Sequence, residues 1–394
     1  MNLGLLGFFK YYNFFADSLV SAYTLFGKRL EISSLRVLLP VGISFYTFQA
    51  LSYTIDVYRR KLEPVTDLIG YFAFISFFPQ LVAGPIERAT HMLPQFLVKR
   101  QFNYAEASDG MRLILWGLFK KLVVADNCAI FVNAVFRNQD QASGAELILG
   151  VFFFAFQIYG DFSGYSDIAI GTARLFGFRL MVNFRTPYFA RDIAEFWRRW
   201  HISLTTWFRD YVYIPLGGSR NGRWSAVKNT FVVFLLSGFW HGANWTFIVW
   251  GGLNALYFLP LLLTDRNRRN MDTVANGRYF PSLKELFQIV LTFAQVCFAW
   301  IFFRAANVSS AWSYIKLIFS PGGGINETGI GVGLLFMGII VLIIFEWLFR
   351  ESEVPFARWS NSRFTRYTVY SAIVILILFF GAYVNPQSFI YFQF

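Results

Sequence analysis

Long runs of apolar residues alternate with short polar connectors along almost the whole chain. An α-helix needs roughly 20 mostly apolar residues to cross a hydrocarbon layer about 30 Å thick. The runs that approach this length are 3–26, 35–53, 68–85, 111–136, 145–159, 230–240, 245–263, 286–303, 331–349 and 367–383. Several are short or contain Gly, Pro or a charge, as tilted, broken or re-entrant helices do. The pattern predicts an all-α polytopic membrane protein with roughly ten transmembrane helices.

The segment 190–211 has a different periodicity. Its apolar residues recur every three or four positions and so line one side of a helix: Ile193, Phe196, Trp197, Trp200, Leu204, Trp207, Phe208 and Tyr211. The other side carries Arg191, Asp192, Glu195, Arg198, Arg199, Ser203, Thr206 and Arg209. Tryptophans opposite arginines are typical of a helix at the headgroup level of a bilayer, so the pattern predicts one interfacial amphipathic helix here.

The composition agrees with a membrane location and excludes other classes. Hydrophobic residues make up 56% of the 394 positions and charged residues only 15%, whereas soluble domains carry about 25% charged residues. Secreted, disordered, fibrous and disulfide-stapled proteins are therefore excluded. The net charge of +12 does not indicate nucleic-acid binding, because basic connectors between apolar runs are what membrane topology requires. No connector is long enough for a separate soluble domain, so we expect one membrane domain over residues 1–394.

The three histidines are the first candidates for chemistry. His241 lies in an almost uncharged stretch at membrane depth, where an ionisable side chain is a functional candidate by default. Imidazole can take a proton from a hydroxyl, which acyl transfer to an alcohol needs. Gly238 and Gly242 form a small-xxx-small pair that lets a helix or substrate approach closely. The alternative is a neutral histidine that is hydrogen-bonded between helices.

The other two histidines carry weaker signals. His201 lies on the apolar stripe one turn after Trp197, where an interfacial structural histidine is an equally good interpretation. His91 follows Glu87 and Arg88 in a polar connector and is expected to be an ordinary loop residue.

Two carboxylates lie within or beside a membrane segment. Asp161 and Asp167 are six positions apart, so they would not share a helix face, and a carboxylate dyad is poorly supported. Pairing with arginines or lining a polar tunnel is the better interpretation. Gly160 and Gly164 repeat the small-xxx-small spacing.

Several common motifs are absent from the sequence. The chain has no G-x-S-x-G, Walker, G-x-G-x-x-G or H-E-x-x-H motif. Metal-ligand residues do not cluster, and Cys128 and Cys297 are expected to be small buried hydrophobic side chains, so no metal site is predicted. Glycosylation sequons at Asn307 and Asn326 match too short a pattern to carry an argument.

Four motifs together resemble the membrane-bound O-acyltransferase (MBOAT) family. They are the run from Glu195 to Gly218, the stretch Ser237 to Gly242, residues 78–86 and residues 160–167. Within this family, the four motifs are most similar to those of alginate-acetylating members. The resemblance implies a ring of tilted helices around a thinned centre, in which His241 and His201 are the functional histidines. We expect a substrate tunnel to be lined by Asp161, Ser163, Asp167, Trp240, Asn244, Arg198 and Trp200.

The same resemblance implies a function. We expect an acetyl group to pass from a cytoplasmic thioester, with acetyl-CoA as the expected donor, across a bacterial inner membrane to an extracytoplasmic polysaccharide. No bound cofactor is expected. A periplasmic acetyltransferase and a polysaccharide export complex are the expected partners, besides the lipid bilayer. Family members usually carry further hydrophobic spans before the point where this chain begins, so we expect the first N-terminal spans to be missing.

Other functions stay open on the sequence alone. Within the family, the alternative is transfer of D-alanine from a carrier protein to teichoic acid. Outside it, a solute transporter predicts flux of an intact solute, although no internal repeat of the transporter kind is visible. A non-catalytic scaffold for an export complex predicts that substitution of the histidines has no effect.

Overall fold

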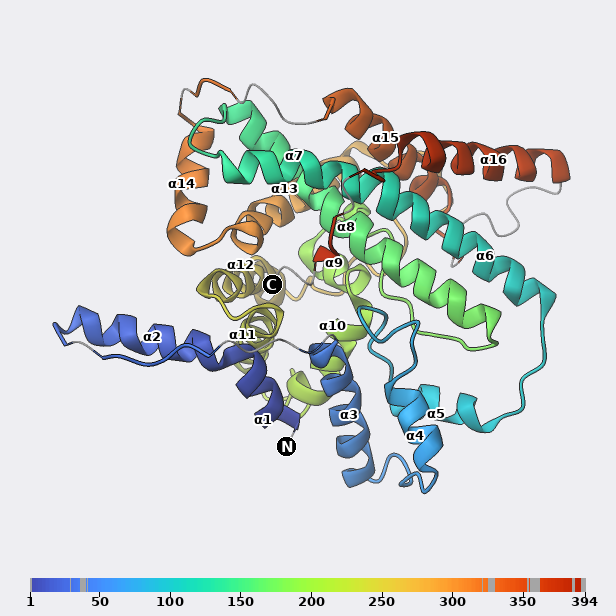
Figure 1. Ribbon diagram of the computed structural model, residues 1–394, viewed down its shortest axis with the longest axis horizontal. Coiled ribbons are helices and arrows are strands. Elements are labelled where there is room, and N and C mark those ends of the chain that lie inside the picture. The colour runs from blue at the N-terminus through green and yellow to red at the C-terminus, as the bar shows by residue number, and fades with distance from the viewer. Residues whose placement is uncertain are drawn as a thin grey trace.

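The computed structural model describes residues 2–28, 30–35, 40, 42–320, 322–324, 330–352, 354, 362–384 and 387–390. Within these ranges the chain forms helices and connectors and no β-strand, as predicted (Figure 1). The N-terminal elements are α1 (Asn2–Leu6), the π-helical turn η1 (Gly7–Tyr11), α2 (Tyr12–Leu25), α3 (Ile43–Tyr58), α4 (Leu68–Ile75) and α5 (Ala89–Leu97).

The longest helices form the centre of the molecule. The middle elements are α6 (Tyr104–Leu118), the π-helical turn η2 (Phe119–Ala125), α7 (Asp126–Arg137), α8 (Gly144–Leu175), the 3-10 turn η3 (Pro187–Phe189), α9 (Ile193–Arg199), α10 (Ile202–Phe208) and the π-helical turn η4 (Arg209–Tyr213). The C-terminal elements are α11 (Arg223–His241), α12 (Trp245–Leu263), α13 (Leu283–Arg304), α14 (Val308–Ile318), α15 (Val332–Leu348) and α16 (Arg363–Phe380).

Helix α8 is the buried axis around which the other helices pack. A capping box of Ser143 and Glu146 begins it, and most of its side chains are buried. The continuous helix α6–η2–α7 runs along it (Figure 1). Glycines permit the close approach, because a Cβ at Gly164 would lie 2.8 Å from the carbonyl oxygen of Gly117. The predicted small-xxx-small contact at Gly160 and Gly164 is thus confirmed.

Four helices among the described residues are long and apolar enough to cross a membrane. They are α8, α12, α13 and α16, and the apolar helix α15 is shorter. The predicted apolar runs at 3–26, 111–136, 230–240 and 331–349 also coincide with helices, namely α1–η1–α2, α6–η2–α7, α11 and α15.

The predicted span 145–159 is too short, because α8 continues to Leu175, and two other predicted spans are helical over only part of their length. Over 68–85 only α4 is helical, and it ends at Ile75. Residues 77–84 then form turns around Pro79, whose ring has no N–H and is incompatible with a helix interior. Over 35–53 the helix begins only at Ile43, and residues 36–39 and 41 lie outside the described ranges.

The prediction of one continuous helix over 190–211 was wrong, whereas the interfacial position of the segment stays a prediction. The segment breaks at His201, whose φ of 43° lies in the left-handed region, so α9 and α10 are separate helices. The tryptophan face packs into the protein, since Trp197, Trp200 and Trp207 are all buried. A hydrophobic stripe identifies the face that is covered, but it does not distinguish lipid from neighbouring helices.

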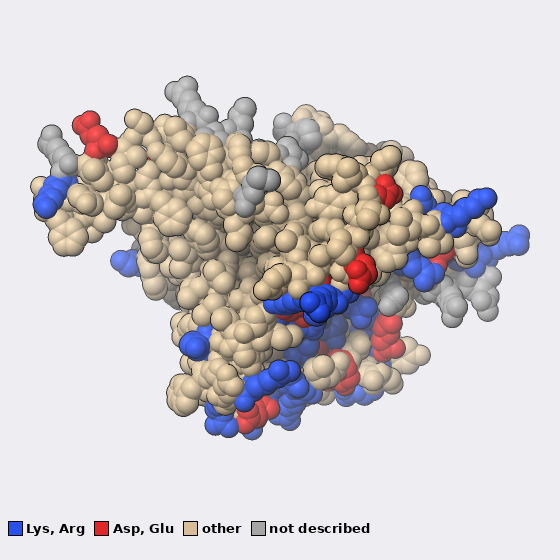
Figure 2. All heavy atoms as spheres, turned by 90° about the horizontal axis from the view of Figure 1, so that it is seen from below, with Lys and Arg blue, Asp and Glu red and all other residues tan. Residues whose placement is uncertain are grey.

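Charged side chains gather on one side of the molecule. Figure 2 shows Lys, Arg, Asp and Glu concentrated along one face, with a largely uncharged band above it. Because apolar surface of this extent is covered by lipid in membrane proteins, the uncharged band fits a bilayer-facing surface.

Candidate active site

The break at His201 is held by a buried polar cluster. The Ile202 N–H donates to the Asn183 carbonyl (2.9 Å), and the Ser203 hydroxyl donates to Asn183 Oδ1 (2.6 Å). Asn183 in turn donates through Nδ2 to the Ser166 hydroxyl of α8 (3.0 Å). These bonds hold His201 in its left-handed conformation, which costs free energy in a residue with a Cβ. They point its ring into the protein, where it is only 1% exposed.

His241 is the last residue of α11 and lies at a very close helix contact. A Cβ on Gly238 would lie 2.2 Å from the Phe247 carbonyl oxygen of α12, so the two helix backbones touch there. A Cβ on Gly242 would collide with the Phe247 ring. The small-xxx-small prediction is confirmed at this pair, and the close contact places His241, 5% exposed, in the centre of the molecule.

The fold brings His201 and His241 together. Their ring centroids lie 6.5 Å apart although the residues come from different elements. Aromatic rings surround the pair: Trp240, Trp250 and Phe303 lie about His241, and Phe162 and Phe45 about His201. Electrostatic interactions are stronger where little water is present, so the positive charge of a proton shared by the two rings would be only weakly screened.

His91 lies apart from this pair. Its Nδ1 is 2.7 Å from the Glu87 carboxylate, and about half of the side chain is exposed. The hydrogen bond to Glu87 raises the pKa of His91. The expectation of a loop residue was wrong, because His91 lies in helix α5, at the surface and outside the site.

Lys10 and Tyr11 belong to the site but escaped the sequence reasoning. The Lys10 ammonium donates to the carbonyls of Trp240 (2.7 Å) and His241 (3.1 Å), and the Tyr11 hydroxyl donates to the Phe239 carbonyl (3.0 Å). The available signal was a lone lysine inside the apolar run 3–26. A charge at such depth is a functional candidate by default.

The carboxylates of α8 bind lysines rather than arginines. Lys120 pairs with Asp167 (2.6 Å), and Lys121 pairs with both Asp161 (2.8 Å) and Asp126 (2.7 Å). The two aspartates therefore occupy different ion pairs, in keeping with the expectation that they do not share a face. Ser163, between them, is fully buried.

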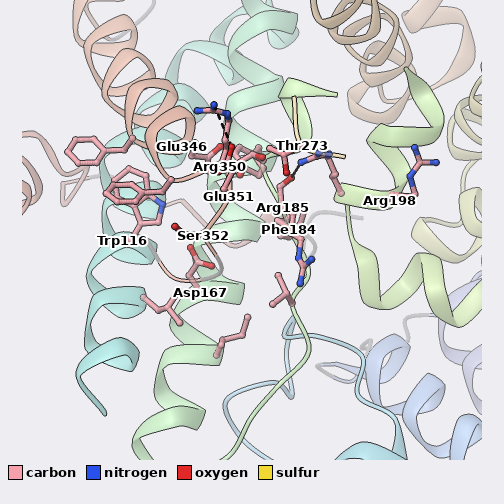
Figure 3. Close-up of a pocket in the computed structure, with 18 of the residues that line it drawn as sticks. Trp116, Asp167, Phe184, Arg185, Arg198, Thr273, Glu346, Arg350, Glu351 and Ser352 are labelled. Carbon is pink, nitrogen blue, oxygen red and sulfur yellow. Dashed lines mark hydrogen bonds and ion pairs between the residues drawn. The ribbon is translucent and has the colours of Figure 1, made fainter. Parts of the chain in front are cut away.

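The remaining predicted tunnel residues are spread over the site. Trp240 stacks on Phe48 (5.3 Å), and Trp200 is buried beside Trp300. Asn244 caps α12 and donates to the Ala306 carbonyl. Arg198 lines a cavity and is labelled in Figure 3.

Two cavities lie near the site. The smaller, about 300 Å³, extends inward to Lys120, Asp167, Tyr159 and Glu346 (Figure 3). The larger, about 710 Å³, has a largely apolar wall that includes Ser237, one helical turn before His241. The larger cavity therefore runs along α11 toward the imidazole.

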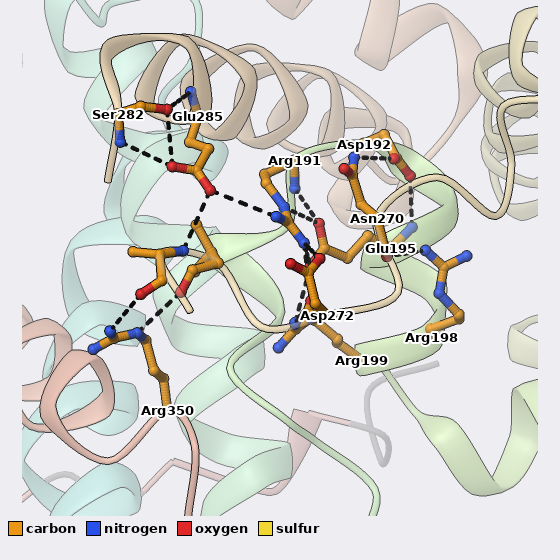
Figure 4. A network of polar contacts seen from close by, with 12 residues as sticks. Arg191, Asp192, Glu195, Arg198, Arg199, Asn270, Asp272, Ser282, Glu285 and Arg350 are labelled. Atoms are coloured by element: carbon orange, nitrogen blue, oxygen red, sulfur yellow. Dashed lines mark hydrogen bonds and ion pairs between the residues drawn. The ribbon is translucent and has the colours of Figure 1, made fainter. Parts of the chain in front are cut away.

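The connector of residues 264–282, here named the latch loop, borders both cavities. Figure 4 shows how arginines tie it down. Arg191 pairs with Asp272 (2.8 Å) and lowers the pKa of that carboxyl through the hydrogen bond. Arg198 donates to the carbonyls of Asn267 (2.8 Å) and Asn270 (2.7 Å). Arg191 and Arg198 therefore fix the loop that borders both cavities.

Comparisons with known proteins agree on a family. The sequence profile described as "MBOAT, membrane-bound O-acyltransferase family" matches residues 58–303. The chain belongs to the MBOAT family. It is 40% identical over 352 residues to "Probable alginate O-acetylase AlgI" of Pseudomonas aeruginosa, which is 88% of this chain and 65% of that protein.

Two further MBOAT-like relatives differ in the acceptor that their names print. The chain is 37% identical to "Peptidoglycan O-acetyltransferase" of Helicobacter pylori, over 80% of this chain and 62% of that protein. It is 28% identical to "Teichoic acid D-alanyltransferase" of Streptococcus thermophilus, over 62% of this chain and 61% of that protein. The chain thus spans about two thirds of the length of these relatives.

The MBOAT match contains the histidine pair but not the whole site. Residues 58–303 include His201, His241 and the aspartates of α8, whereas Lys10 and Glu346 lie outside them. Among the described residues, no group of His, Cys, Asp or Glu could hold a metal ion.

Proposed function

We propose that this MBOAT protein is a membrane O-acetyltransferase. It would pass an acetyl group from a cytoplasmic thioester across the inner membrane for O-acetylation of an extracytoplasmic polysaccharide such as alginate. The observation that carries the proposal is the imidazole pair of His201 and His241, 6.5 Å apart within the aromatic core and one helical turn from the larger cavity. The similarity to alginate O-acetylases supports the choice of acyl group and polymer.

In this mechanism His241 is the general base. Its neutral imidazole takes the proton of the acceptor hydroxyl while the oxygen attacks the thioester carbonyl carbon. The C–S bond then breaks, the thiolate leaves, and the imidazolium returns the proton to sulfur, so the products are an O-acetyl ester and a free thiol. His201 would assist as a neighbouring hydrogen-bonding group. Holding donor and acceptor together supplies orientation that is worth up to several orders of magnitude in rate.

Acetyl-CoA is the donor that the proposal favours, as a substrate and not as a bound cofactor. The larger cavity suits its entry, because an apolar wall leads toward His241 and charged residues such as Arg209, Arg223 and Arg268 lie at its rim. Arginine guanidinium groups are well matched to phosphate oxygens. Asp161, Ser163 and Asp167 of α8, with Trp200, Trp240 and Asn244, would form the surroundings of the path through the protein.

The expected surroundings follow from the same assignment. The protein would lie in a bacterial inner membrane as a ring of roughly ten tilted helices, with the charged face toward the cytoplasm, where basic residues are retained. A periplasmic acetyltransferase that receives the acetyl group, and a polysaccharide export complex, are the partners that the proposal includes.

Replacement of His241 by Ala tests the catalytic assignment. We expect the acetyl content of the exported polymer to fall by 100-fold or more, since general-base catalysis contributes about 10²–10⁴ in rate. The measurement is the ester content of the polymer at a verified, equal abundance of the protein in the membrane. His91→Ala is the matched control because His91 lies at the surface. Normal acetylation in His241→Ala would contradict the assignment.

D-alanyl transfer is the second candidate, because of the teichoic acid D-alanyltransferase relatives. Purified protein can be offered labelled acetyl-CoA or a carrier protein charged with labelled D-alanine. Label transferred only from the carrier would replace the acetyl assignment, whereas label transferred only from acetyl-CoA would support it.

A further inference from the structure

The π-helical turn η1 lies across the C-terminal end of α11. Tyr11 donates to the carbonyl of Phe239, and Lys10 donates to the carbonyls of Trp240 and His241. The Tyr11 ring also stacks on the Phe239 ring, with centroids 4.1 Å apart and planes 15° from parallel. Three consecutive carbonyls at the end of α11 therefore accept hydrogen bonds from two neighbouring side chains of another helix.

These carbonyls need such partners. The last four carbonyls of a helix receive no hydrogen bond from an N–H of the same helix. In a membrane protein, little water is present to act as the donor instead. The chain leaves α11 in an extended conformation at Gly242, with φ −159° and ψ 151°, so no left-handed C-terminal turn satisfies them. The donors from η1 thus fix the turn that carries His241.

The charge of Lys10 adds an electrostatic effect. A cation at the C-terminal end of a helix is favourable because of the helix dipole. The same ammonium bonds the backbone carbonyl of His241, so it lies beside the turn that carries the imidazole. The His201 ring, from the break between α9 and α10, is a further titratable group near His241. When Lys10 is protonated, its positive charge opposes a second one nearby, which favours the neutral imidazole that a general base needs.

We propose that Lys10 and Tyr11 are positioning residues for His241. Tyr11 and Lys10 hold the last turn of α11 in place, and the Lys10 ammonium keeps the imidazole ready to accept a proton. The π-helical geometry fits this role, because such turns occur frequently at functional sites. The inference rests on the proposed function, in which His241 is the base.

Kinetic measurement on variants of η1 tests the positioning role. With the purified full chain, we expect Lys10→Met and Tyr11→Phe to lower kcat for acetyl transfer by about 10- to 100-fold, because small displacements of a reacting group cost this much. KM for acetyl-CoA should change by less than threefold, and Lys10→Arg should recover part of kcat. Asn13→Ala is the matched control: Asn13, in the first turn of α2, exchanges two hydrogen bonds with the backbone of Leu35 in the following connector.

A second measurement reads the charge effect without any enzymatic activity. The chain has only three histidines, so His91→Gln with His201→Gln leaves His241 as the single imidazole for ¹⁵N NMR. Adding Lys10→Met to this background should shift the titration of His241 to higher pH, whereas adding Asn13→Ala should not. Because this readout needs no acyl transfer, it can succeed even if the proposed reaction is wrong.

Two results would overturn the inference. One is a Lys10→Met protein whose kcat and His241 titration both equal those of the unsubstituted residue. The other is a loss of kcat in Asn13→Ala equal to that in Lys10→Met, which would assign the effect to general packing of the N-terminal helix.

Discussion

Glycine decides how closely α11 and α12 approach beside the candidate base. The Phe247 carbonyl oxygen occupies the place where a side chain at Gly238 would begin. His241 follows one turn later on the same helix, so its position depends on this backbone contact. The place of a histidine ring often depends mainly on its side-chain rotamer, but here the position of the whole helix end determines where the imidazole lies.

Gly238→Ala should therefore destabilise the protein. The new methyl group has to displace the Phe247 backbone, and overpacking of this kind costs about 1–3 kcal/mol. The control is Gly252→Ala, where the nearest atom to the new Cβ is a Leu235 methyl group at 3.9 Å. Thermal unfolding in detergent should show a lower Tm for Gly238→Ala and an unchanged or higher Tm for Gly252→Ala. Equal transitions in the two variants would contradict the close contact.

At the scale of elements, the latch loop is held by the buried guanidinium of Arg191, which pairs with the exposed Asp272 of the loop. Arg191 is 7% exposed and contacts Glu195, Asp272 and Glu285. Arg350, which follows α15, donates to the carbonyls of Val274 and Ala275 in the second half of the loop. Buried pairs are costly to break because the remaining partner is left uncompensated, whereas exposed pairs contribute little.

Arg191→Gln should free the latch loop for proteolysis. Loss of the guanidinium leaves Asp272 without its main partner, so the loop should unfold locally more often and let trypsin bind and cleave the chain after Arg266 and Arg269. The control is Arg223→Gln, which removes the exposed pair with Asp265 at the start of the same loop. The rate of cleavage within 264–282 should rise severalfold only in Arg191→Gln. A similar rise in both variants would show that the buried network does not hold the loop.

Some features of the fold and the site could be predicted from the sequence, and others could not. Apolar length is a local signal, so helices such as α8, α12 and α13 were foreseen. The break at His201 was not, because the hydrophobic stripe continues through it and the bonds that hold it come from Asn183, 18 positions earlier in the chain. Lys10 was missed for a related reason, since its carbonyl partners belong to a helix 230 positions away.

For the molecule as a whole, the charged face predicts an orientation. Basic clusters did not alternate along the sequence, yet folding gathers charged side chains on one face (Figure 2). Both cavities border the latch loop, which carries Arg266, Arg268 and Arg269. Because Lys and Arg are retained in cytoplasmic connectors, this face should be the cytoplasmic one, on the side where a thioester donor is available.

Labelling of an introduced cysteine tests that orientation. In a Cys128→Ala, Cys297→Ala background, Arg269→Cys should react with a membrane-impermeant maleimide in inverted vesicles and not in intact spheroplasts, since Arg269 is exposed. Trp224→Cys, also exposed and close to the rim of the larger cavity, should give the same pattern. Labelling of Arg269→Cys in intact spheroplasts would reverse the orientation.

The π-helical turn η2 limits which insertions and deletions the chain can tolerate near the site. It contains one residue more per turn than an α-helix, which lets the neighbouring residues Lys120 and Lys121 reach two different aspartates of α8. Deleting a single residue there would turn everything from Asp126 to Arg137 by about 100° relative to α6. An aligned homologue with a one-residue gap in this turn should therefore also have lost one of the two lysine–aspartate pairs.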